Sequence, residues 1–201
     1  MRYIKEKSNI QIEINKSIFI ALFYPLESKD DVGFYIEETK KAYPKANHYC
    51  SASIFGMNGE HQTASDDGEP SRTAGIPILE VLKHHDVTNI LCVVVRFFGG
   101  VKLGSGGLLR AYTKAPADLM KQTKFYEKKM VPVYQIEFDY ALIIQMDQYF
   151  DKKATIQEKT FLETVTYKLS LLEENDTLIS DIEYQLKSLK QLNNEILWIE
   201  A

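Results

Sequence analysis

Hydrophobic and polar positions in the first 120 residues form alternating strand-like and helix-like segments. Apolar residues that alternate, or run on between turn-forming residues, predict strands over 9–26 (one strand or two), 47–57 and 89–98. Apolar residues that recur every three or four positions predict helices over 28–43, 73–85 and 108–120. The polar stretch 58–72 is expected to be the longest loop. The β-branched run in the third strand predicts burial on both of its faces.

The last 70 residues follow the order strand, helix, strand, strand, helix, strand. The predicted segments are 131–140, 141–154, 155–161, 163–174, 177–192 and 194–200. This order is that of a ferredoxin-like domain. Because charged residues cluster at 122–132, we expect the boundary there, and the chain is predicted to be an α+β protein with domains 1–128 and 129–201.

Charge changes sign at this boundary. Residues 1–129 hold 18 Lys and Arg against 15 Asp and Glu, whereas residues 130–201 hold 6 against 13, for a net charge of −4. The chain therefore lacks a general basic field for nucleic acid, and such a contact would need a local patch. The two cysteines, Cys50 and Cys92, suggest buried reduced thiols. A polar start and the lack of a long apolar run predict a cytoplasmic protein that makes no membrane contact.

Five of the ten glycines fall between Gly99 and Gly107, where the third strand leads into the third helix. Amide groups in such a turn, with the helix N-terminus behind them, can bind an anion. The residues proposed to contact phosphate or nucleic acid are Arg96, Lys102, Gly104, Ser105, Gly106, Gly107, Arg110 and Lys114. The spacing matches no dinucleotide fingerprint, Walker A loop or nucleophile elbow. The alternative is a tight corner between strand and helix, and the residues leave both readings open.

A second cluster, "SDDGEPSRTAG", lies at 65–75 and contains Asp66, Asp67 and Glu69. Carboxylates this close together are able to hold a divalent cation or to divide acid and base roles. The favoured interpretation is a turn, with Ser71 or Thr73 capping the next helix. No metal site or cofactor is predicted, because no zinc or EF-hand spacing occurs.

Histidines and aromatic residues add weaker candidates. The four histidines, His48, His61, His84 and His85, are interpreted as structural or solvated, with His61 an outside candidate because it lies near the acidic cluster. Tyr49, Phe55 and Phe97 have the chemistry to stack on RNA bases, although core packing is the favoured interpretation.

Four segments resemble the IMPACT/YigZ family: "KSIFI" (16–20), "PKANHYC" (44–50), "SDDGEPSRTAGIPIL" (65–79) and "VVVRFFGGVKLGSGGLLRAY" (93–112). The resemblance implies a front domain with a βα sandwich similar to elongation factor G domain IV and ribonuclease PH, and a tail similar to domain V. It also implies an acidic signature loop made of Asp66, Asp67, Gly68, Glu69, Arg72 and Thr73. Eukaryotic relatives are translation regulators that act through protein contacts. For the bacterial relatives, association with nucleic acid or ribosomes is inferred from the likeness to elongation factor G and ribonuclease PH.

Two positions depart from the family pattern. Arg72 stands where the family usually has glycine, and Ile18 stands where it often has arginine. If the family's glycine is needed for a positive φ, or to let a ligand approach the backbone closely, the side chain of Arg72 narrows the candidate binding site. Ile18 removes one cation from a candidate patch.

Three functions follow from these patterns. The first is a translation-associated regulator, without established catalysis, that contacts RNA, the ribosome or a translation-related protein. The second is a protein-interaction module that uses the acidic tail. The third is a metal-dependent enzyme acting on a nucleotide or phosphorylated substrate, and an enzyme is the less favoured class.

Overall fold

The structure is a computed structural model that describes residues 1–172 and 177–201. Contacts divide the chain into two compact units. The front unit comprises Met1–Glu127 with Glu200–Ala201, and the rear unit comprises Lys128–Ile199. Both units combine a β-sheet with helices, which confirms the prediction of a mixed helix-and-sheet chain.

The front unit is built on a five-stranded antiparallel sheet with strand order β1-β2-β5-β3-β4. In chain order its elements are β1 (Ser8–Ile14), β2 (Ser17–Pro25), α1 (Asp31–Ala42), β3 (His48–Phe55), β4 (His61–Ser65), α2 (Gly75–His84), β5 (Ile90–Phe97) and α3 (Gly104–Met120). The central strand β5 is buried from Ile90 to Arg96, as its run of β-branched residues predicts.

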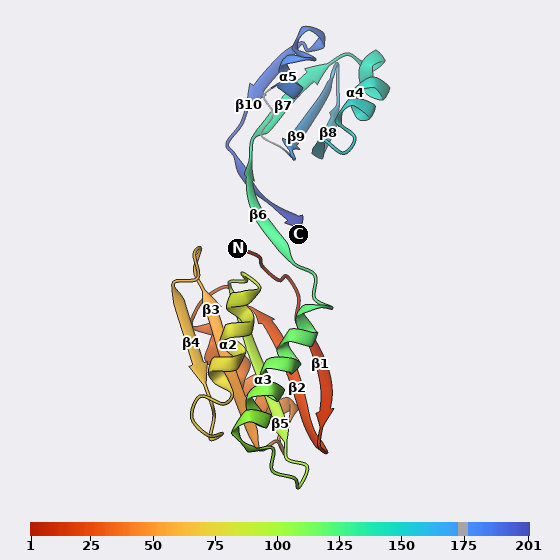
Figure 1. The fold of residues 1–201 in the computed structure, drawn as a ribbon. Helices are drawn as coiled ribbons and strands as arrows, with labels where there is room; N and C mark the ends of the chain where they lie inside the picture. The colour runs from red at the N-terminus through yellow and green to blue at the C-terminus, as the bar shows by residue number, and fades with distance from the viewer. Residues whose placement is uncertain (173–176) are drawn as a thin grey trace. The chain divides into compact units, whose positions relative to one another are not determined.

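Helices cover both faces of this sheet. Figure 1 shows α2 and α3 side by side on one face, where they pack on side chains such as Phe19, Phe23 and Val94. The other face packs against α1 through Leu22 and Val93. The sheet is therefore the middle layer of three, and the segments that follow its strands meet at its ends.

Two predictions for the front unit were wrong. The expected loop 58–72 contains β4, which lies at the sheet edge and is exposed throughout, so no alternation marks it. Its backbone pairs with β3, and the hydroxyls of Ser53 and Thr63 lie 2.7 Å apart. The third helix begins at Gly104 rather than at Leu108, since glycine's low helix propensity does not prevent a helix that is packed on a sheet.

From β6 onward the elements are β6 (Tyr126–Val131), β7 (Val133–Phe138), η1 (Tyr140–Leu142), α4 (Ile143–Phe150), β8 (Ala154–Phe161), β9 (Val165–Leu171), α5 (Thr177–Ser180), η2 (Glu183–Gln185), β10 (Ser188–Gln191) and β11 (Glu195–Glu200). Strands β10, β7, β9 and β8, in that order, form an antiparallel sheet. Residues of α4 and α5 pack on one face of it with Ile136 and Tyr167. The opposite face carries polar side chains such as Gln135 and Lys168.

One prediction for the rear unit was wrong, and a second was confirmed as a strand but not as part of the main sheet. Residues 177–192 form one helical turn, a 3-10 turn and strand β10 instead of a single helix. Leu186 and Leu189 reach the core from extended backbone, and β10 supplies hydrogen-bond partners to the edge of β7, so tertiary pairing overrides the helical spacing. The predicted last strand, 194–200, is β11, which pairs with β6 and lies outside the four-stranded sheet.

Candidate functional site

The acidic loop before α2 is organised around the carboxylate of Asp66. Its Oδ1 accepts hydrogen bonds from the N–H groups of Ala74 (3.0 Å) and Gly75 (2.8 Å), and its Oδ2 accepts one from Arg72 N–H (2.7 Å). Burial raises the pKa of Asp66, but these backbone hydrogen bonds outweigh burial and hold it below its ordinary value of 3.8. Asp66 is therefore the residue that caps α2, instead of Ser71 or Thr73.

Two further polar side chains of this loop, those of Asp67 and Thr73, also bind the protein itself. The carboxylate of Asp67 accepts the N–H of Tyr49 at 2.7 Å, which ties the loop to β3. Thr73 donates its hydroxyl to the carbonyl of Pro70 at 2.6 Å. Gly68 has a φ of 83°, which allows the chain to turn between Asp67 and the buried residue that follows.

Glu69 is the buried centre of the site. Its Oε1 accepts hydrogen bonds from Arg96 Nη1 at 2.6 Å and from Tyr112 Oη at 2.8 Å, and all three residues are buried. The Arg96 guanidinium lies over the rings of Phe19 and Phe98, at 5.4 and 5.6 Å from their centroids. Its Nε is a buried nitrogen without an acceptor in the part of the chain that the structure describes. The loop, β5 and α3 are thus joined through one carboxylate.

Two residues of β3 complete this cluster. His48 Nδ1 lies 2.8 Å from the carbonyl oxygen of Asp67, so the ring donates from Nδ1, and His48 Nε2 lies 4.0 Å from Glu69 Oε1. Cys50 donates its thiol to the carbonyl of Asp66 at 2.9 Å. Burial raises the pKa of Cys50 to about 12 and also raises the pKa of Tyr112. Both groups therefore remain protonated at neutral pH.

Arg72 adopts the left-handed backbone that the family's glycine would favour, with a φ of 63°. Its N–H is bonded to Asp66, which holds this conformation in place. The side chain is exposed and extends out from the loop. Ile18, the second departure from the family pattern, is half-buried on β2 opposite Phe97.

The glycine corner, residues 99–107, turns the chain from β5 into α3. A Cβ at Gly99 would collide with the backbone of Lys16 and Ser17, so the corner touches the β1–β2 turn. Gly104 begins α3 with a φ of 68°. Gly106 and Gly107 lie within the first turn of that helix, together with the exposed Ser105.

The predicted cations of this region lie in different environments. Lys102 and Arg110 are exposed. Lys114 is exposed but pairs with Asp118 at 2.5 Å. Arg96 is buried against Glu69 and is therefore not placed to meet an external phosphate with the others.

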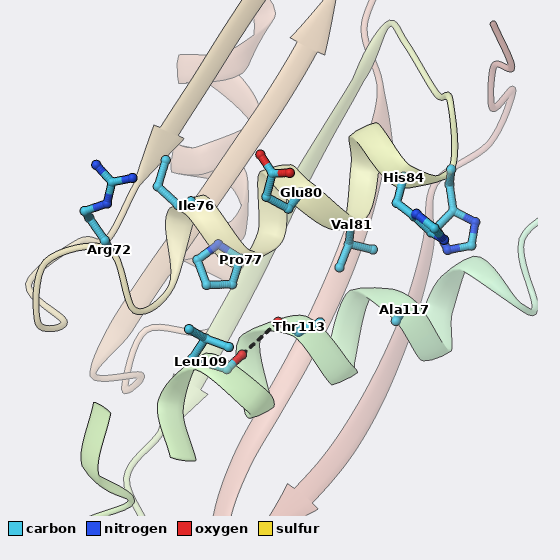
Figure 2. A pocket seen from close by; sticks show the side chains of 10 residues that line it. Arg72, Ile76, Pro77, Glu80, Val81, His84, Leu109, Thr113 and Ala117 are labelled. Carbon is cyan, nitrogen blue, oxygen red and sulfur yellow. Dashed lines mark hydrogen bonds between the residues drawn. The ribbon is translucent and has the colours of Figure 1, made fainter. Parts of the chain in front are cut away.

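An apolar groove lies between α2 and α3, with a volume of about 420 Å³. Figure 2 shows its two walls, α2 above and α3 below, with Arg72 at one end and His84 at the other. The residues that line it are Arg72, Ile76, Pro77, Glu80, Val81, His84, His85, Leu109, Thr113 and Ala117.

Sequence reasoning missed several members of this region. His48 and Cys50 were interpreted as structural or buried residues and Tyr112 was given no role, whereas the structure joins the three to Glu69 or to the carbonyl of Asp66. Their position in the segments that resemble the family was the available signal. Over residues 1–172 and 177–201, no group of three or more His, Cys, Asp and Glu side chains is placed to hold a metal ion. Over the same residues, no helix has the length and apolar character that crossing a membrane requires.

The segments that form this site lie in a region that matches a known protein family. Residues 15–120 match the Impact N-terminal domain. The IMPACT family member YvyE of Bacillus subtilis (strain 168) is 35% identical over 175 residues, which cover 87% of this chain and 80% of YvyE.

Two solved structures are also similar. A crystal structure described as a hypothetical protein is 26% identical, with a TM-score of 0.62 over 96% of this chain and 97% of that chain. The two-domain translational regulator Yih1 is 25% identical, with a TM-score of 0.38 over 57% of this chain and 44% of that chain. Since the family domain spans more than half of the residues and YvyE aligns over most of both chains, the chain belongs to the IMPACT family.

Proposed function

We propose that this protein is a translation-associated regulatory protein whose front unit contacts RNA, on the ribosome or free, through the glycine corner. Membership of the IMPACT family supports a role in translation, which is what the family resemblance implied. The proposal includes two functional domains, 1–128 and 129–201, similar to domains IV and V of elongation factor G, in a cytoplasmic protein. The rear domain, with its excess of acidic residues, would contact a translation-related protein partner.

The observation that carries the proposal is the composition of the exposed corner. Val101, which is 45% exposed, and the exposed Lys102 lie in the corner; Phe98, 48% exposed, comes just before it, and the exposed Arg110 follows it on α3. The first turn of α3 contains no acidic residue, and no side chain caps it. Such a surface offers amides and cations to phosphates and an aromatic ring to a base.

The buried cluster has a supporting role in this proposal. Glu69 links the acidic loop to Arg96 and Tyr112, and Tyr112 lies on the helix that begins at the corner. A metal-dependent enzyme would need the carboxylates of the acidic loop to be free. Asp66, Asp67 and Glu69 are each engaged by donors of the protein, so this alternative has less support.

The test is the salt dependence of RNA binding. Fluorescence anisotropy of a labelled single-stranded oligouridine probe, and sedimentation with ribosomes, are measured for the unaltered protein and for Lys102→Ala/Arg110→Ala. The double variant is expected to bind more weakly and to lower the slope of log K against log salt by about 0.7 for each phosphate of the single strand that it no longer neutralises. Lys41→Ala, on the exposed side of α1, is the matched control. A protein that binds neither probe at low salt would contradict the proposal.

A further inference from the structure

The groove between α2 and α3 is a second surface of the front unit, separate in composition from the glycine corner. Its floor is apolar, with Pro77 and Val81 buried, while Leu109 at its mouth is 48% exposed. The Thr113 hydroxyl already donates to the carbonyl of Leu109 at 2.8 Å, as Figure 2 shows. The groove wall on α3 therefore presents no unsatisfied hydroxyl to a ligand.

Both walls have a helical repeat. Leu109, Thr113 and Ala117 succeed one another at intervals of four residues along α3. The α2 wall repeats at the same interval, through the pairs 76–77, 80–81 and 84–85. In Figure 2 the labelled residues of the two helices advance together, so the walls run parallel. An interval of eight residues gives a groove about 12 Å long, which accommodates the roughly 10.5 Å between apolar positions i and i+7 of a third helix.

The charges at the groove favour an acidic occupant. The exposed guanidinium of Arg72 stands at the end where α2 begins; it is within ion-pair distance of no carboxylate among the residues that the structure describes, although its charge acts on the nearby Asp66. Glu80, the acidic residue of the groove lining, is already paired with Lys83 at 2.9 Å. The N–H groups at the N-terminus of α2 are taken by the Asp66 carboxylate, so Arg72 is the cation that an acidic side chain would meet here.

We propose that this groove binds an amphipathic helix of a protein partner, with apolar side chains at i, i+4 and i+7 on the groove floor and a carboxylate against Arg72. The apolar residues would bury Leu109 and extend the α2–α3 pair to three helices. The inference goes beyond the proposed RNA contact, because it uses a different surface and a different class of partner. Removal of the corner cations Lys102 and Arg110 is therefore expected to leave peptide binding in the groove unchanged.

The probe is a labelled synthetic helical peptide of about 14 residues with leucine at i, i+4 and i+7 and glutamates at both ends. A control peptide has the same composition with the leucines spread around the helix. Fluorescence anisotropy is expected to give saturable binding of the patterned peptide to the full-length protein. Leu109→Glu is expected to weaken binding by about tenfold or more. Phe34→Glu, at a 66% exposed position on α1, is the matched control and is expected to bind as the unaltered protein does.

A second variant tests the charge without altering the fold. Arg72→Gly keeps the left-handed backbone and removes the cation. It is expected to weaken binding of the glutamate peptide several-fold, and to leave binding of a peptide with glutamine in place of glutamate unchanged. Urea unfolding of each variant shows whether the front unit is intact.

The outcomes decide the proposal. Absence of saturable binding by the patterned peptide overturns it, as does equal binding by Leu109→Glu and Phe34→Glu. Binding of dodecanoate without binding of the peptide also overturns it, and assigns the groove to small amphipathic acids. Loss of RNA binding in the corner variant together with normal peptide binding leaves the groove proposal standing, so the two proposals fail separately.

Discussion

The front and rear units use their sheets differently. The front sheet is covered on both faces, and its central strand carries Arg96 into the interior, where Glu69 meets it. The rear sheet is covered on one face and leaves polar side chains, among them Glu158 and Lys168, on the other. A charge on the rear sheet face can be hydrated, whereas a charge inside the front unit needs a partner. The family's signature segments therefore supply interior structure as well as surface.

The largest expected difference between the units comes from removing one carboxylate. Glu69→Ala leaves the buried guanidinium of Arg96 without its acceptor and is expected to destabilise the front unit by about 3–5 kcal/mol. Glu158→Ala on the rear sheet face is expected to change stability by less than about 0.5 kcal/mol. Amide hydrogen exchange followed residue by residue in the front unit measures the first effect. The fluorescence of Trp198, the single tryptophan, reports on the rear unit.

Equal losses for the two variants would remove the contrast between the units. A Glu69→Gln variant keeps the shape and one acceptor oxygen while it removes the charge. It is expected to retain more stability than Glu69→Ala, because the amide still accepts from Tyr112.

Thiol reactivity gives the next effect. Burial raises the pKa of Cys50 from 9.0 to about 12, so its thiolate fraction at about pH 8 falls roughly a thousandfold. Cys92 is fully buried, and burial raises its pKa as well. The native protein is expected to react very slowly with an aromatic disulfide reagent, and the unfolded protein to release two equivalents. Fast labelling of Cys50 in the native protein would mean that the interior of the front unit opens readily.

The loss of stability in acid is expected to be a smaller effect than these, and to arise in the front unit. The pKa of Asp66 is lower in the folded protein than in the unfolded chain, so its capping contributes stability above the unfolded pKa, which is lost as pH falls through the folded pKa. Asp66→Asn is expected to cost about 1 kcal/mol at neutral pH and to reduce the acid-induced loss. Urea unfolding of both proteins between about pH 7 and pH 3, with the front unit monitored, is the measurement. Parallel curves for the two proteins would contradict this assignment.

The smallest expected effect compares two left-handed residues, one in each unit. Arg72 and Lys152 have φ values of 63° and 59°. Replacement of either by glycine removes the cost of a left-handed side-chain-bearing residue, which is about 1 kcal/mol before the entropy of the unfolded chain offsets part of it. Both variants are expected to gain a few tenths of a kcal/mol. A clear loss for Arg72→Gly alone would show that its side chain contributes a stabilising contact.

The sequence predicted those elements whose own side chains carry the periodicity. The β-branched run of β5 and the apolar stripe of α2 were recognisable in the sequence, because buried positions in these elements require apolar residues. Strand β4 was not recognisable, since it is fixed by backbone pairing at an edge. Strand β10 was not recognisable either, because its Leu189 and the preceding Leu186 fit a helical spacing equally well.

The sequence indicated which segments form the candidate site, but not which of their residues contact one another. The acidic loop and the glycine corner were identified as the unusual stretches of the chain. The contact of Glu69 with Arg96 joins residues 27 positions apart, and its contact with Tyr112 joins residues 43 apart. Such contacts depend on strand order, which one sequence does not determine. For the same reason Arg96 was grouped with the exposed cations although it lies inside.

The last residue of the chain also bears on how the two units can be handled. The N–H of Ala201 donates to the carbonyl of Phe125 at 2.9 Å, so the chain leaves and re-enters the front unit at neighbouring points. The rear unit is thus an insertion in the chain of the front unit, between residues 127 and 200. A short linker that replaces residues 128–199 and joins Glu127 to Glu200 should therefore give the front unit as a separate protein. The rear unit of a relative, inserted at the same two points, should give a chimaera that reports which unit chooses the partner.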